Sequence, residues 1–111
     1  MNWIDLNNAG QLAAIKELSK IRPQLIFKHS TRCSISSMAL SRMERKEQPE
    51  TSDFYFLDLI KYRSLSNKIA EDFEVNHESP QVLLIKNTEC VYDESHSGIQ
   101  MDEITEQILA N

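Results

Sequence analysis

The sequence predicts an α/β fold in which a central four-stranded mixed sheet is flanked by four helices. The hydrophobic pattern switches several times between the period of a helix and the period of a strand along the 111 residues. Helices and strands that alternate in this way are typical of layered α/β proteins with parallel strands. The last two strands follow each other through a tight connection, which makes the sheet mixed. A chain of this length buries one modest core, so residues 1–111 are expected to form a single domain.

The first half of the chain supplies two of the helices and two of the strands. Leu12, Ile15 and Leu18 recur every three residues, which predicts a helix that ends before Pro23. A short apolar run follows as a buried strand, and a polar turn separates it from a second helical pattern. The buried side of that second helix is expected to consist of Ile35, Met38, Ala39 and Met43. The expected elements are a helix over 8–20, a strand over 24–29, a helix over 35–46 and a strand over 53–58.

The second half of the chain adds a helix, a strand hairpin and a terminal helix. Ser64 is expected to cap the third helix, whose apolar stripe runs from Leu65 to Phe73. Residues 87–89 form the tight connection between the last two strands. The expected elements are a helix over 64–73, strands over 82–86 and 90–94, and a helix over 101–110. Four strands and four helices in this order are the arrangement of the thioredoxin fold.

Composition excludes several classes of protein. The chain has 12 basic and 17 acidic residues and a net charge of −5, which argues against a nucleic-acid-binding protein. The N-terminus does not resemble a secretory signal, and no apolar run is long enough to span a bilayer, so a cytoplasmic protein without membrane contacts is expected. Two cysteines in such a chain do not make a disulfide framework. Burial, metal binding or chemistry must explain each of them.

Cys33 lies where a predicted strand ends and a predicted helix begins. The first N–H groups of a helix have no partner within it and its dipole is positive there, so a thiolate at this position is stabilised. The thiolate is the nucleophile in disulfide exchange. Lys28, His29 and Arg32 add positive charge nearby. The alternative is that Cys33 is a small hydrophobic residue buried at a helix start, but the polar turn before it favours a reactive thiol.

Ser36 occupies the place where a dithiol oxidoreductase carries its second cysteine. A serine hydroxyl can donate a hydrogen bond to a thiolate, but it cannot resolve a mixed disulfide. The sequence therefore predicts that Cys33 acts by a monothiol route, with Ser36 beside it.

Ser79 and Pro80 directly precede Gln81, from which the chain runs as a strand to Lys86. In a thioredoxin fold, a cis proline at this place lies against the reactive cysteine, and the backbone beside it can bind substrate. The alternative is an ordinary trans proline that opens a strand, which is the commoner isomer. The context of the predicted fold favours the cis isomer at Pro80.

These features together resemble the monothiol bacilliredoxins, the bacterial redox proteins of the bacillithiol system. The resemblance runs from Trp3 along nearly the whole chain. Two positions depart from the family, namely Ser34, where members usually have proline, and Ser97, where they tend to have an aromatic residue. The matching stretches are Ile26–Cys33 with Ile35 and Ser36, Tyr62–Arg63 with Leu65–Asn67, His77–Gln81, and Ser95–His96.

The resemblance implies a reaction and its partners. Cys33 would attack a mixed disulfide between a client protein and bacillithiol, take the small thiol onto itself and free the client, and a second thiol would regenerate Cys33. Bacillithiol would be a co-substrate, no cofactor would be bound, and the protein would be a monomer. If the host makes no bacillithiol, another small thiol or a protein disulfide is the partner. Bacillithiol carries two carboxylates, so the binding candidates are mostly cationic: Lys28, His29, Arg32, Arg63, His77, Ser79, Pro80 and His96.

Two other functions stay open. A cluster of iron and sulfur could be shared between two chains, as in some monothiol glutaredoxins, although those proteins carry glycine where this chain has Ser34. A thioredoxin-fold adaptor without enzymatic activity is the other alternative, because fold alone does not give function. No cluster of cysteine and histidine supplies the ligands of a zinc site.

Cys90 opens the fourth predicted strand, at the end of the sheet opposite Cys33. A strand of five residues separates those ends by about 17 Å, whereas a disulfide needs Cα atoms within about 7 Å. Cys90 is therefore expected to be a half-buried structural residue.

Overall fold

The computed structural model describes residues 1–110 and contains a five-stranded sheet with the strand order β1-β3-β2-β4-β5. Strands β1, β2 and β3 are parallel to one another, while β4 is antiparallel to β2 and β5 is antiparallel to β4. In chain order the elements are β1 (Trp3–Asp5), α1 (Gly10–Leu18), β2 (Gln24–His29), α2 (Ser34–Glu44), β3 (Asp53–Asp58), α3 (Arg63–Asp72), β4 (Gln81–Lys86), β5 (Glu89–Ser95), the 3₁₀ turn η1 (His96–Gly98) and α4 (Met101–Leu109). The predicted α/β class and its four helices are confirmed.

The sheet has one strand more than the sequence predicts. Residues Trp3–Asp5 pair in parallel with Phe54–Phe56 and form the edge strand β1. Three residues are too few for a strand period to emerge from a pattern, and only Trp3 among them is partly buried. The indole of Trp3 packs on Phe27, Phe54 and Phe56, which anchors the edge strand to the core.

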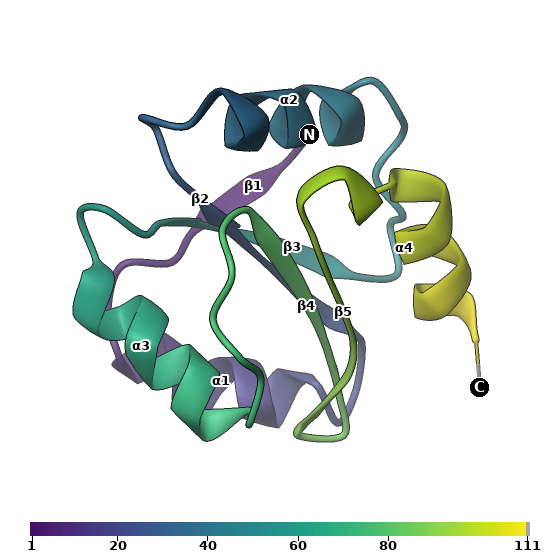
Figure 1. The fold of residues 1–111 in the computed structure, drawn as a ribbon. Helices are drawn as coiled ribbons and strands as arrows, with labels where there is room; N and C mark the ends of the chain where they lie inside the picture. Colours follow the sequence, from purple (N-terminus) through teal and green to yellow (C-terminus); the bar gives the residue numbers. More distant parts are fainter. Residues whose placement is uncertain (111) are drawn as a thin grey trace.

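Helices cover both faces of the sheet, with α1 and α3 on one face and α2 and α4 on the other (Figure 1). Each face has its own apolar cluster, and the residues of β2 and β4 alternate between the two. Every residue of β2 is buried, because this strand lies in the centre of the sheet with a layer of helices on each side. Within residues 1–110 no helix is both long enough and apolar enough to cross a membrane.

Helix α2 buries a narrower face than its apolar residues suggest. Its buried side chains are Ser36, Ala39 and Met43, whereas Ile35 is 50% exposed and Met38 is 60% exposed. The expectation that Ile35 and Met38 face the core is wrong. The helix turns a serine inward because the buried side chains of β2 supply it with a polar partner, as described below.

The end of α1 and the start of α3 also differ in detail from the sequence patterns. Leu18, at the end of α1, is 39% exposed, and the adjacent Ser19 is buried in its place. Helix α3 begins at Arg63 after Tyr62, and no side chain caps it, so Ser64 lies in its first turn. Ser19 is buried because it joins α1 to the β4–β5 connection, where its hydroxyl accepts the Thr88 N–H at 2.8 Å.

The two edges of the sheet are short or charged. Strand β1 has three residues, and β5 carries the acidic residues Glu89, Asp93 and Glu94. The register of β5 against β4 shifts between Leu84 and Ile85.

Candidate functional site

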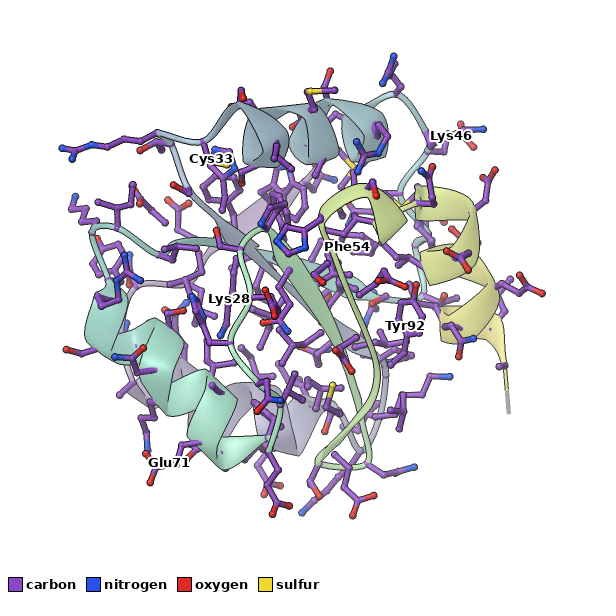
Figure 2. The ribbon with its side chains drawn as sticks, in the orientation of Figure 1. Lys28, Cys33, Lys46, Phe54, Glu71 and Tyr92 are labelled. Atoms are coloured by element: carbon purple, nitrogen blue, oxygen red, sulfur yellow. The ribbon has the colours of Figure 1, made fainter. Side chains whose placement is uncertain are left out.

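The connection from β2 to α2 presents Cys33 at the start of the helix (Figure 2). Cys33 is the N-cap residue of α2, with extended backbone angles of −115° and 120°. Its carbonyl accepts the Ser37 N–H at 3.1 Å, and its own N–H donates to the Ser30 carbonyl at 3.2 Å. The side chain is half-buried, is not in a disulfide and makes no capping hydrogen bond. The thiol thus stands beside the first N–H groups of α2, which no side chain caps.

The Ser36 hydroxyl is fully buried beneath this turn. It accepts the Ser30 N–H at 3.0 Å and shares a hydrogen bond of 2.7 Å with His29 Nδ1. Both hydrogen bonds go to the segment that leads into the Cys33 turn, and neither goes to the Cys33 thiol. Ser36 therefore has a structural role in this state of the protein.

His29 lies under the turn and is not a surface group. It is 5% exposed, and its ring packs 5.7 Å from the Phe27 ring and 5.2 Å from the Phe56 ring. Burial lowers the pKa of His29 below its ordinary value, although Asp58 and Glu44 act in the opposite direction. The expectation that His29 contacts substrate does not fit this position.

Replacing Ser36 with alanine is expected to lower the free energy of unfolding by about 1–3 kcal/mol, because the buried Ser30 N–H and His29 Nδ1 lose their partner. Urea denaturation measures this change. Ser37→Ala is the matched control, because Ser37 is exposed on the same turn of α2, and it should change stability by less than about 0.5 kcal/mol. Equal effects of the two substitutions would contradict the structural role of Ser36.

Lys28 points to the opposite face of β2 from His29 and is also fully buried. Its ammonium donates to the Ser66 carbonyl at 3.0 Å and lies 3.2 Å from His77 Nδ1. Burial lowers the pKa of Lys28 from its ordinary value of 10.5 to about 8. Lys28 was expected to face a substrate, but successive side chains of a strand point to opposite faces, and this one points under α3.

The segment before β4 is held by a glutamine that the sequence patterns did not single out. Gln81 Nε2 donates to the Asn76 carbonyl at 2.9 Å, and Gln81 Oε1 accepts the Glu78 N–H at 3.3 Å. The Ser79–Pro80 peptide bond in this segment is cis. A glutamine directly before the apolar run Val82–Ile85 was the available signal.

The remaining cationic candidates lie at the surface. Arg32 and Arg63 are exposed, His77 is half-buried, and His96 is exposed with its Nε2 atom 3.8 Å from Glu78 Oε2. Arg63 lines a cavity of about 440 Å³ between the N-terminal ends of α1 and α3.

Arg42 of α2 is a second residue that sequence reasoning missed. Its guanidinium donates to the Ile99 carbonyl at 3.1 Å and to the His96 carbonyl at 2.9 Å. The turn that contains His96 is thereby fastened to the helix that carries Cys33. An arginine in the last turn of an amphipathic helix gives no sequence signal for such a contact.

The topology brings these segments to one end of the sheet. Cys33 follows the end of β2, Arg63 follows the end of the parallel strand β3, and Pro80 precedes the antiparallel strand β4. Gln81 pairs with Ser95, so His96 follows β5 at the same end. This end therefore holds one thiol, the guanidinium groups of Arg32 and Arg63, and the imidazoles of His77 and His96. Within residues 1–110 no three histidine, cysteine or acidic side chains gather as metal ligands.

Cys90 lies at the opposite end of the sheet. It pairs with Ile85, which in turn pairs with Gln24 at the start of β2. Burial raises the pKa of Cys90 to about 11, and its thiol donates to the Tyr92 carbonyl at 3.3 Å. The six residues of β2 separate it from the Cys33 turn by about 20 Å, too far for a disulfide.

Comparisons with known proteins agree with this geometry. The family model described as monothiol bacilliredoxin BrxC matches residues 4–104. A solved thioredoxin-fold protein that has been proposed to be an oxidoreductase is 30% identical, with a TM-score of 0.81 over 93% of this chain and 90% of its own. Two thioredoxins share the fold at lower identity. That of Malassezia sympodialis is 16% identical (TM-score 0.71, 96% of this chain and 88% of its own), and that of Fasciola hepatica is 18% identical (TM-score 0.71, 94% of each chain).

Proposed function

The chain belongs to the monothiol bacilliredoxin family, and from this membership we propose that it removes bacillithiol from protein mixed disulfides through Cys33. The Cys33 thiolate attacks the bacillithiol sulfur. A Cys33–bacillithiol disulfide forms, the disulfide bond to the client breaks, and the client leaves as a thiolate that takes a proton from solvent. The thiolate of a second small thiol then attacks this bacillithiol sulfur, forms a disulfide with it and releases Cys33 as a thiolate.

The observation that carries the proposal is a single half-buried thiol at the uncapped start of α2. Helix N-termini stabilise a thiolate through their free N–H groups and their dipole. Ser36 stands where a second cysteine would be needed to resolve the mixed disulfide within the chain, and its hydroxyl is already bonded to the turn. An external thiol must therefore complete the cycle.

The polar side chains at this end of the sheet support an anionic small thiol as the group transferred. Arg32 and Arg63 offer cations to its carboxylates, and His77 and His96 offer imidazole nitrogens. The backbone of Ser79 is the candidate for its peptide-like part, because the Pro80 carbonyl already accepts the His96 N–H at 3.1 Å. The clients are S-thiolated proteins, and the cytoplasm is the compartment where such mixed disulfides would be reduced.

Mass spectrometry of the Cys90→Ser variant tests this function. The variant is mixed with a model protein that carries one bacillithiol disulfide, and both proteins are weighed intact after acid quenching. The client should lose one bacillithiol while the variant gains one at Cys33, and a glutathione mixed disulfide should react more slowly. No adduct on Cys33 with either small thiol would overturn the proposal.

A further inference from the structure

The Lys28 ammonium is buried without a carboxylate to balance it. Its two polar partners among residues 1–110 are the Ser66 carbonyl and His77 Nδ1, and both are neutral acceptors. The charged groups around His77 are Lys28, Arg63 and Glu78. A buried charge held by neutral groups lowers stability relative to an apolar side chain, which makes Lys28 a candidate for a role in the site.

The contact with Lys28 determines which ring nitrogen of His77 carries the proton. An ammonium group has only donors, so the nitrogen facing it must accept and the imidazole proton must be on Nε2. Burial, Lys28 and Arg63 lower the pKa of His77, and only Glu78 opposes them. His77 Nε2 has no hydrogen-bond partner in the described chain and is not among its buried polar atoms that lack one. The Nε2–H is therefore open to solvent.

Lys28 and Gln81 act on the same segment. They are register partners on β2 and β4, both are buried, and they bond to residues 76–78 immediately before the cis Ser79–Pro80 bond. Two side chains of the central strands thus hold residues 76–78, which lie at the same end of the sheet as Cys33. Figure 2 shows Lys28 between the sheet and α3, while Cys33 lies at the start of α2.

We propose that Lys28 is a positioning residue that holds His77 as a neutral imidazole with its free Nε2–H turned outward, and that this N–H binds a carboxylate or carbonyl oxygen of the incoming small thiol. The inference rests on the proposed thiol exchange. In this arrangement Lys28 does not bind the small thiol itself, because its side chain is enclosed. His77 acts as a neutral hydrogen-bond donor and not as an acid or a cation.

Imidazole ¹⁵N NMR tests the positioning part without substrate. In the unmodified protein at pH 7, His77 should be neutral, with its proton on Nε2 alone. Lys28→Met should produce a mixture of the two neutral tautomers and raise the titration midpoint of His77. Lys20→Met is the matched control, because Lys20 is exposed and pairs with Glu17, and it should leave His77 unchanged. An unchanged tautomer and midpoint in Lys28→Met would overturn the positioning role.

Exchange kinetics with a bacillithiol mixed disulfide test the binding part. Lys28→Met and His77→Ala should each raise KM about tenfold, the worth of one hydrogen bond, and change kcat less than about twofold. His77→Gln should keep KM near the original, because its amide supplies an N–H. The double variant should be no worse than His77→Ala, and additive losses or an unchanged KM would overturn the donor role. If the unmodified protein exchanges no such disulfide, the proposed function and the donor role fail together, while the NMR result still decides how Lys28 acts on His77.

Discussion

Replacing Cys33 with serine is expected to reduce the rate of thiol exchange by at least about a thousandfold, because removal of a nucleophile ends covalent catalysis. A serine hydroxyl at the start of α2 is neither ionised at neutral pH nor able to form a disulfide. The surrounding structure should be preserved, since serine is a favoured N-cap residue. The release of bacillithiol from a model protein, followed over time, measures the loss.

Cys90→Ser is the matched control for this variant. Because burial raises the pKa of Cys90 to about 11, only about one thiol in ten thousand is ionised at pH 7. Its removal should change the exchange rate less than about twofold. Retention of more than a tenth of the activity in Cys33→Ser, or its loss in Cys90→Ser, would move the chemistry away from the α2 thiol.

Raising the pH from 8 to 10.5 is expected to increase the free energy of unfolding of the unmodified protein by about 3 kcal/mol relative to that of Lys28→Met. The pKa of Lys28 is about 8 in the folded protein against an ordinary value of 10.5. Between these values the unfolded chain binds more protons than the folded one, so stability rises with pH. A difference of 2.5 in pKa corresponds to about 3 kcal/mol, and the contribution is lost again as pH falls through 8.

The comparison with Lys28→Met removes the contributions of all other titratable groups, because both proteins carry them. Urea denaturation at several pH values gives the two curves. At pH 7 the methionine variant should be at least as stable as the unmodified protein, because an apolar side chain of similar length fills the site without a charge. Parallel curves for the two proteins would show that Lys28 titrates alike in the folded and unfolded chains.

The sequence predicts the central strands well, because they are short apolar runs bounded by proline or polar turns. β2 and β3 occupy the ranges 24–29 and 53–58 that the pattern gives. The sequence does not predict β1, which depends on pairing with residues 54–56 far along the chain. Helical spacing alone also does not decide which side of α2 is buried, because Ser36 is buried through its hydrogen bond with His29 Nδ1.

For the site, chain order alone predicts that Cys33, Arg63, Pro80 and His96 meet at one end of the sheet. That follows from the positions of the strand ends. The roles of Lys28 and His29 could not be predicted in the same way, because each strand side chain faces a different layer of helices. Contacts made by Gln81 and Arg42 connect elements distant in sequence, and no local pattern encodes them.

The sheet edges have a consequence for how the molecules meet one another in concentrated solution. An exposed strand is a template for pairing with a strand of another molecule, and charged or very short edges oppose such pairing. Two β5 strands placed side by side would bring Glu89, Asp93 and Glu94 of each copy together, and β1 offers only three residues. Both edge strands of the sheet therefore oppose pairing with other molecules, which protects the sheet against growth into intermolecular fibrils.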